Sequence, residues 1–227
     1  MMSVLDDPKL EALLDGLHAQ SLGQDAEVDA YYATHGAGGR KLRNDVGETK
    51  AFLSDKLVAL DRDKAEFCYL MCRALNATCI VEAGTSYGVS TLYLAAAVRA
   101  NARASSTKGV VIGTEYEPAK AAAARANFAA AGLADLIDLR EGDLRETLRD
   151  VGGAVDFMLI DIWIAMARPA LELVSPRLRA GAAVVCDNTS AHPDEYQDYF
   201  AFIAAQGDRM RTMTLPFRGG LELTVRC

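Results

Sequence analysis

Short apolar runs alternate along the chain with longer segments whose apolar residues recur every three or four positions. Five of these runs have the length of buried strands, at residues 78–81, 109–114, 137–140, 157–160 and 182–186. The segments between them have the spacing of amphipathic helices. This alternation predicts a doubly wound α/β fold, with a mostly parallel sheet and helices on both of its faces.

Two segments refine this picture. A helix is predicted to open at Asp61, and five apolar residues in it should face the core: Phe67, Leu70, Met71, Ala74 and Leu75. Near the C-terminus, residues 210–215 and 221–225 flank a turn at 216–220 that contains two glycines. We expect this pair to form an antiparallel hairpin at the edge of the sheet, which brings the predicted strands to seven.

The first part of the chain has a different character. Residues 1–54 alternate short helical patterns with helix breakers, whereas the strand and helix alternation occupies residues 55–227. We therefore predict a helical N-terminal extension and a single following domain. The extension contains Tyr31, Tyr32 and the glycine-rich stretch 35–39, which together are a candidate lid because lids need flexible joints.

Composition excludes several classes of partner. The 227 residues suffice for one core, and the net charge of −7 opposes binding to nucleic acid or to anionic membranes. No apolar run is long enough to span a bilayer, and the N-terminus does not resemble an export signal. Four of the five cysteines lie in apolar stretches, which favours buried thiols and a cytoplasmic location. The pair Cys68 and Cys72 fits core packing better than zinc binding.

The turn after the first strand is the first candidate site. Glu82 ends that strand and stands at the lip of a turn that contains Gly84 and Gly88. Ligands of such sheets bind at the carboxyl ends of the strands, where glycines allow a close approach of the backbone. The glycine spacing differs from that of dinucleotide-binding turns, so a nucleotide-dependent oxidoreductase is disfavoured. A plain strand-to-helix turn remains the structural alternative.

Acidic residues also follow the next two strands. Glu115 ends the second strand, where a carboxylate can accept hydrogen bonds from both ribose hydroxyls of a nucleoside. Asp143 follows the third strand and could accept a hydrogen bond from an adenine amino group. An ordinary acid in a turn is the alternative for each of them.

Three oxygen-bearing side chains follow two later strands. Asp161 ends one apolar strand, and Asp187 and Asn188 end another. These side chains should converge at one edge of the sheet, and carboxylate and amide oxygens are ligands that suit a hard cation such as Mg²⁺. Capping of the two turns is the competing interpretation.

Taken together, these motifs resemble the class I S-adenosylmethionine-dependent O-methyltransferases of the catechol and caffeoyl-CoA type. The resemblance rests on EAGTSYG at 82–88, EYEP at 115–118, GD at 142–143, DIW at 161–163, DN at 187–188 and LPFRGGL at 215–221. It implies a Rossmann-like fold, S-adenosylmethionine as cofactor, Mg²⁺ or a similar cation, and a small hydroxylated acceptor of phenolic or enolic type.

The resemblance also implies roles for individual residues. Val58 and Leu60 would line the methionine end of the cofactor, and Glu82, Gly84 and Ser90 would form the floor under its amino-acid and ribose parts. Three further acids would complete the site. Glu115 would bind the ribose, Asp143 would lie on the adenine side, and Asp161 would contact the cofactor as well as the cation, with Asp187 and Asn188 as the other cation ligands.

One position departs from the pattern of the metal-dependent relatives. Ile164 stands where they commonly carry a lysine that acts as general base. His192 is the nearest replacement by sequence, with Asp161 as its catalytic companion, although an exposed loop histidine is the plainer interpretation. A metal-independent methyltransferase and a non-catalytic ligand-binding protein therefore stay open as alternatives.

The state of assembly is a separate expectation. Tyr196, Tyr199 and Phe200 recur at helical spacing, which favours a core or a dimer face over a substrate pocket. We expect a homodimer.

Overall fold

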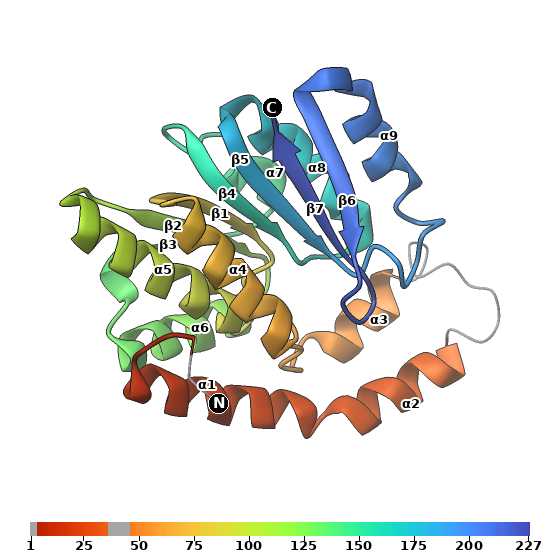
Figure 1. Cartoon of the computed structure of the whole chain (residues 1–227). Coiled ribbons are helices and arrows are strands. Elements are labelled where there is room, and N and C mark those ends of the chain that lie inside the picture. The colour runs from red at the N-terminus through yellow and green to blue at the C-terminus, as the bar shows by residue number, and fades with distance from the viewer. Residues whose placement is uncertain (1–3, 36–45) are drawn as a thin grey trace.

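The computed structural model describes residues 4–35 and 46–227, and these form a layered α/β molecule around one sheet (Figure 1). The sheet has the order β3-β2-β1-β4-β5-β7-β6. Its strands are β1 (Cys79–Ala83), β2 (Val110–Glu115), β3 (Ile137–Glu141), β4 (Val155–Ile160), β5 (Leu178–Asp187), β6 (Met210–Leu215) and β7 (Leu221–Arg226). The first five strands run parallel to one another, and β7 runs antiparallel to both β5 and β6. The predicted Rossmann-like fold with its C-terminal hairpin is confirmed.

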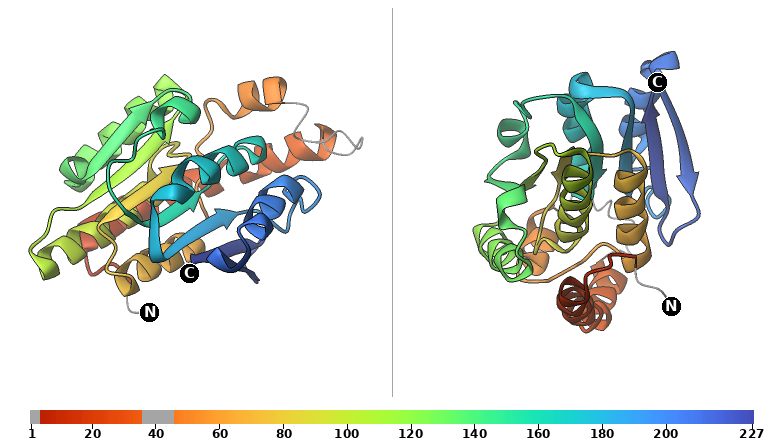
Figure 2. Two further views of the ribbon diagram at one scale, coloured as in Figure 1. Left: turned by 90° about the horizontal axis from the view of Figure 1, so that it is seen from above. Right: turned by 60° about the vertical axis from the view of Figure 1, so that its left-hand side comes forward.

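Helices cover both faces of this sheet (Figure 2). They are α1 (Pro8–Leu22), α2 (Asp25–His35), α3 (Val46–Leu53), α4 (Arg62–Ala74), α5 (Val89–Ser105), α6 (Pro118–Ala131), α7 (Leu144–Thr147), α8 (Ile164–Val174) and α9 (Gln197–Ala205). Alternation of side chains along β4 separates the two cores, because Phe157 and Leu159 pack with α1, α4, α5 and α6. Met158 and Ile160 point the other way and pack with α7, α8 and α9.

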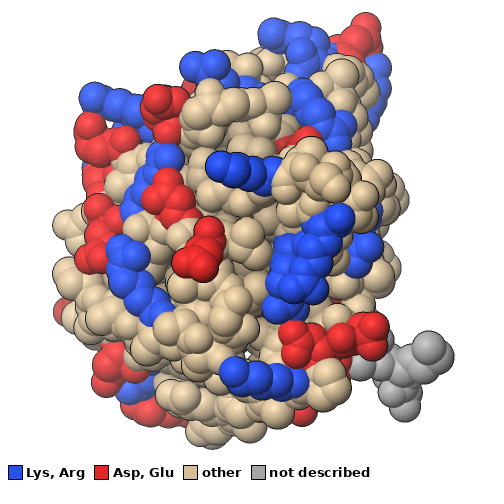
Figure 3. Space-filling view, turned by 90° about the vertical axis from the view of Figure 1, so that its left-hand side faces the viewer, with Lys and Arg blue, Asp and Glu red and all other residues tan. Residues whose placement is uncertain are grey.

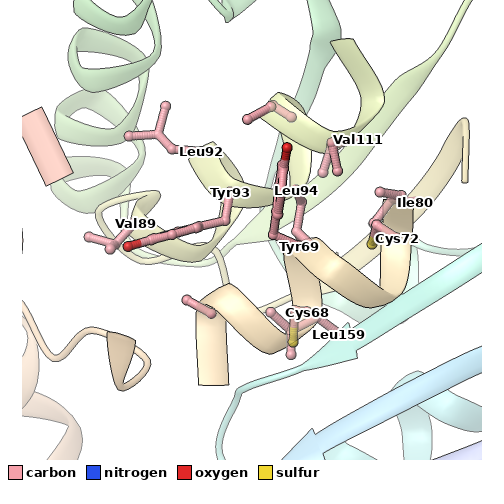
Figure 4. Close-up of a cluster of buried hydrophobic side chains, with 14 of the residues drawn as sticks. Cys68, Tyr69, Cys72, Ile80, Val89, Leu92, Tyr93, Leu94, Val111 and Leu159 are labelled. Carbon is pink, nitrogen blue, oxygen red and sulfur yellow. The ribbon is translucent and has the colours of Figure 1, made fainter. Parts of the chain in front are cut away.

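Helix α4 forms where the sequence predicts it, but its most deeply buried residues are not the predicted ones. Leu70 is 53% exposed, and the buried residues are Lys64, Ala65, Cys68, Tyr69 and Cys72. Figure 4 shows Cys68, Tyr69 and Cys72 among side chains of the sheet and of α5. Phe67, Met71 and Leu75 pack against the margin of the same cluster, so the predicted apolar face is correct in part.

The N-terminal helices pack on the main body of the protein. Leu10, Leu14 and Leu17 of α1 are buried in the same apolar cluster as the β4 side chains Phe157 and Leu159. Helices α2 and α3 contact each other through stacked rings of Tyr31 and Phe52, whose centroids lie 4.0 Å apart. Residues 36–39 of the candidate lid lie outside the described residues. The division at residue 54 and the lid stay predictions.

The aromatic residues before and within α9 belong to the protein core. Tyr196 and Tyr199 are buried, and Phe200 packs against the same apolar cluster. The sequence left a core and a dimer face open for these residues, and the structure shows core packing. The buried thiols of Cys68, Cys72 and Cys186 are likewise free and lie in apolar surroundings.

Candidate functional site

The turn after β1 lies directly against the end of β4. Gly84 has a φ of +99°, and a Cβ atom at this position would stand 1.9 Å from the carbonyl oxygen of Asp161. The backbone N–H of Asp161 donates to the carbonyl oxygen of Ala83, at 3.0 Å. Glycine is required here because any side chain would push apart the two strand ends that the site depends on.

Glu82 lies beneath this turn rather than at its lip. Its carboxylate is fully buried and accepts hydrogen bonds from the hydroxyls of Thr85, Ser90 and Thr91. Burial raises the pKa of Glu82, and the three hydroxyl donors oppose that rise. The strand places Glu82 on the face that α5 covers, where it anchors the first turn of α5. Its contact with a cofactor stays a prediction.

The end of β2 meets the same turn. The Glu115 carboxylate accepts hydrogen bonds from the backbone N–H of Ser86, at 2.7 Å, and of Glu117, at 2.8 Å. Strands β1 and β2 are direct neighbours, with Glu82 paired to Gly113. The two acid-bearing strand ends therefore come together as the sequence predicts, with the Glu115 carboxylate nearer to the turn.

A small hollow opens beside this turn, and most of the predicted cofactor residues border it. Its lining includes Val58, Leu60, Gly84, Ser90 and Asp161. The remaining lining residues are Leu57, Ala59, Thr85, Ser86, Tyr87 and Val89. Three separate parts of the sequence thus border one concave surface. That these residues bind a cofactor stays a prediction.

The loop that carries Val58 and Leu60 is held by side chains of other elements. The Tyr87 hydroxyl donates to the carbonyl oxygen of Asp55, at 2.9 Å. The backbone N–H of Leu57 donates to Gln24, and that of Ala59 donates to Ser21. The N-terminal helices therefore position one wall of the hollow, a role that the sequence did not reveal.

Asp143 stands one strand further along the sheet edge. It caps the short helix α7 by accepting from the backbone N–H of Arg145, and it also pairs with the Arg145 guanidinium. These two hydrogen bonds lower the pKa of Asp143 to about 2. The N–H of the preceding Gly142 donates to the carbonyl oxygen of Glu115, which places Asp143 beside the end of β2. Its contact with adenine stays a prediction.

Asp161 and Asp187 form an acidic pair at the ends of β4 and β5, in which Asp187 is buried and Asp161 is half-buried. Ile160 pairs with Cys186 in the sheet, so the two carboxylates follow matched positions on neighbouring strands. Burial raises the pKa of both groups, and the Asp187 charge raises that of Asp161 further. Lys64 opposes this rise, since its Nζ atom donates to Asp187 Oδ1 at 2.7 Å.

The predicted cation ligands do not fit a divalent metal ion. The Lys64 ammonium already binds Asp187. Asn188 has a φ of +61° and turns its side chain toward Gly219, where its Oδ1 would lie 2.5 Å from an added Cβ. Among residues 4–35 and 46–227, no group of three or more His, Cys, Asp or Glu side chains could hold a metal. A second positive centre beside an ammonium would also be repelled. The proposed ligation by Asp161, Asp187 and Asn188 stays a prediction that these contacts do not support.

No described contact links the candidate base to the acidic pair. The His192 side chain is 40% exposed and lies 3.9 Å from the Glu195 carboxylate. Ile164, at the position of the expected lysine, packs at the edge of the second apolar cluster. The catalytic role of His192 stays a prediction.

Comparison with known proteins agrees with this geometry. Residues 81–189, which run from β1 to the end of β5, match a family model described as a methyltransferase domain. This segment is similar to methyltransferase domains. It contains the Gly84 turn, Glu115 and the acidic pair, and the resemblance to O-methyltransferases drawn from the motifs is confirmed.

Two curated catechol O-methyltransferases are similar to the chain. The one from Mycobacterium tuberculosis is 32% identical over 136 residues, which are 58% of this chain and 57% of that protein. The match therefore spans little more than half the length of that relative. The enzyme from Niastella koreensis is 27% identical over 175 residues, or 74% of this chain and 75% of that one.

Solved structures share the fold of the methyltransferase domain and its flanking helices. An O-methyltransferase from Bacillus cereus in complex with SAH has a TM-score of 0.67 at 22% identity, covering 93% of this chain and 100% of that one. A second such structure is TomG from Streptomyces achromogenes, an O-methyltransferase involved in tomaymycin synthesis, in complex with SAM. It has a TM-score of 0.64 at 22% identity, covering 88% of this chain and 96% of that one. At this level of identity the likeness establishes the fold.

Proposed function

We propose that this protein transfers the methyl group of S-adenosylmethionine to an oxygen atom of a small hydroxylated molecule, of phenolic or enolic type. The observation that carries the proposal is the position of the Glu115 carboxylate. It stands at the end of β2, bound to the Ser86 N–H, beside a turn in which Gly84 leaves no side chain in the way. The similarity to two catechol O-methyltransferases supports the choice of oxygen as acceptor.

The lining of the hollow suits the parts of this cofactor. Val58 and Leu60 offer an apolar wall for the methionine chain, and Ser90 and Gly84 lie at the turn below it. A carboxylate with two oxygens, such as Glu115, can accept hydrogen bonds from two ribose hydroxyls. Asp143 would mark the adenine side.

Charge also favours this ligand. Bound S-adenosylmethionine supplies a methyl group on a positively charged sulfur. Asp161 borders the hollow, and Glu115 stands at the neighbouring strand end. Negative groups beside a cation are favourable, and their attraction weakens when methyl transfer removes the sulfur charge. The task left to the protein is to hold the acceptor oxygen in line with the methyl carbon and away from water.

Two further parts of the proposal concern the setting of the protein. We propose a cytoplasmic location, which is supported by five free cysteines, three of them fully buried. We also propose a homodimer, on the expectation drawn from the sequence alone.

The function is tested by a methyl-transfer assay. Purified protein is incubated with S-adenosylmethionine and a panel of phenols, enols, amines and thiols, and methylated products are identified by mass spectrometry. We expect products methylated on oxygen. Products methylated only on nitrogen or sulfur would refute the acceptor atom, and binding of the cofactor without any product would favour the non-catalytic alternative.

A variant pair ties the activity to the site. Glu115 and Glu141 pair across β2 and β3, but Glu141 binds the exposed Arg125 instead of the turn. Glu115→Gln should lower kcat/KM by about tenfold or more, because hydrogen bonds to a charged group contribute about 1.5–3 kcal/mol. Glu141→Gln should leave kcat/KM within about twofold of wild type. Equal losses in both variants would contradict the assignment of Glu115.

A further inference from the structure

Lys64 is the most unusual buried residue next to the site. It lies in the first turn of α4, with 2% of its side chain exposed. Lysine is rarely buried so completely unless its charge is paired. Here Nζ donates to Asp187 Oδ1 at 2.7 Å and lies 3.2 Å from Asp61 Oδ2. The interior therefore holds a fixed positive charge between acids from two distant parts of the sequence.

The charges around Lys64 show that the ammonium is held firmly. Burial alone would lower the pKa of Lys64, but the carboxylates of Asp187 and Asp61 outweigh burial and raise it. On the outer side, the Arg218 guanidinium binds Asp61 at 2.8 Å. The Lys64 charge also acts to lower the pKa of Asp161, which follows the strand next to that of Asp187. The Lys64 ammonium thus supplies the positive charge beside the acidic pair, without an ion from solution.

We propose that the ammonium of Lys64 permanently takes the place of a divalent cation at the Asp161 and Asp187 pair, so that this site binds no metal ion. Three features support this assignment. Asp187 is already bound by an ammonium, Asn188 turns toward Gly219, and a dication would be repelled by the buried charge. This proposal about the metal site does not depend on the proposed methyl transfer.

The assignment has a consequence for the acceptor, and this consequence rests on the proposed function. Mg²⁺ fills several coordination positions with oxygens of water and substrate, so a metal site favours acceptors with two adjacent oxygens. A single ammonium bound to protein carboxylates has no such requirement. Acceptors with one isolated hydroxyl should therefore be methylated as well as their vicinal dihydroxy counterparts.

The decisive experiment measures Mn²⁺ binding to the full-length protein by calorimetry and electron paramagnetic resonance, with and without S-adenosylhomocysteine. Wild-type protein should show no binding up to millimolar Mn²⁺. Lys64→Met removes the ammonium and should raise the Mn²⁺ affinity by about tenfold or more. Lys64→Arg keeps the charge and should behave like wild type.

Arg179 offers a matched control, because it lies at the start of β5, and Asp187 lies at the end of that strand. Arg179 Nε lies 2.5 Å from Asp156 Oδ1, so Arg179→Met also removes a cation from a carboxylate. Asp156 lies at the opposite end of β4 from Asp161, so this variant should gain no Mn²⁺ affinity. Micromolar Mn²⁺ binding to wild type that disappears in Asp187→Asn would overturn the proposal, even if Lys64→Met does not fold. A folded Lys64→Met variant that gains no Mn²⁺ affinity would overturn the role of Lys64.

An activity measurement separates this proposal from the proposed function. Turnover with a monohydroxylated phenol should be unchanged by EDTA and by added Mg²⁺. If S-adenosylhomocysteine binds but EDTA abolishes turnover and Mg²⁺ restores it, the metal-free site is refuted and the methyltransferase function stands. If S-adenosylhomocysteine does not bind, the function fails, and the Mn²⁺ titration still decides the metal question.

Discussion

At the scale of single residues, Gly84 sets the geometry of the cofactor site. Its left-handed backbone and its contact with the Asp161 carbonyl leave no space for a side chain. The sequence predicted the position of this glycine, because it follows an apolar run at a strand end. The sequence could not show the contact itself, because Asp161 belongs to a strand that lies much further along the chain.

We predict that Gly84→Ala destabilises the protein by at least about 2 kcal/mol, since an L-residue pays 1–2 kcal/mol for this backbone and the overlap adds to it. Urea unfolding measures the loss. Gly153→Ala is the control, because nothing lies within 4 Å of its added Cβ, and it should change stability by less than about 0.5 kcal/mol. Equal stability of the two variants would contradict the close approach of β1 and β4.

A second residue, His18, should make stability depend on pH. Its Nε2 atom lies 3.2 Å from the Tyr93 hydroxyl in a buried setting, and burial lowers the pKa of His18 to about 4. In the unfolded chain the imidazole has its ordinary pKa of about 6.5. The stabilisation that comes from keeping His18 neutral in the fold is therefore complete above pH 6.5, and it is lost as the pH falls toward 4. The loss reaches up to about 3 kcal/mol at pH 4.

The measurement compares unfolding free energies at several pH values. His18→Gln keeps a hydrogen-bonding group near Tyr93 but cannot titrate, so its stability should fall less between pH 6.5 and 4 than that of wild type. His192→Gln, at an exposed histidine, should follow the wild-type curve. Parallel curves for His18→Gln and wild type would show that His18 is not buried in its neutral form.

At the scale of elements, the loop between α3 and α4 depends on the N-terminal helices. Ser21 and Gln24 accept the backbone N–H groups of Ala59 and Leu57, on either side of the lining residue Val58. Sequence patterns show that helices exist, but not that their polar side chains hold a loop more than thirty residues away. This contact is why part of the site wall could not be predicted.

We predict that the double variant Ser21→Ala, Gln24→Ala weakens S-adenosylhomocysteine binding by about three- to tenfold, because two hydrogen bonds of about 1 kcal/mol each no longer order the loop. Hydrogen exchange at Leu57 and Ala59 should become faster. Ser54→Ala removes a hydroxyl that donates to the carbonyl oxygen of Ala51 in α3, and it should change neither quantity. Unchanged exchange in the double variant would refute the anchoring role.

Helix α4 shows where periodicity alone fails. The helix and its start near Asp61 were predictable, but the burial of Lys64 in its first turn was not. A lysine within an apolar pattern is normally placed on the surface. Its partner Asp187 stands 123 residues further along the chain, so only the folded sheet brings the two together.

At the scale of the whole molecule, the parallel sheet explains why the site was largely predictable. Every acid predicted at a strand end lies at the same edge of the sheet, because parallel strands end on one side. The sequence could not decide which of these acids face ligand. Glu82 turned under α5, and Asn188 turned toward Gly219, through contacts that only tertiary packing creates.

The surface agrees with a small-molecule ligand. The chain carries a net charge of −7, and acidic and basic side chains lie interspersed on the face shown in Figure 3. None of the helices in the described part of the chain is both long and apolar enough to span a membrane. A mixed surface of this kind offers no extended basic path for a nucleic-acid backbone along the face shown.

Calorimetric titration with S-adenosylhomocysteine tests the central claim most directly, because every proposed role depends on that pocket. Wild-type protein should bind it with a micromolar Kd, Glu115→Gln should bind about ten- to hundredfold more weakly, and Glu141→Gln should match wild type. Folded wild-type protein that shows no binding at millimolar S-adenosylhomocysteine would contradict the account.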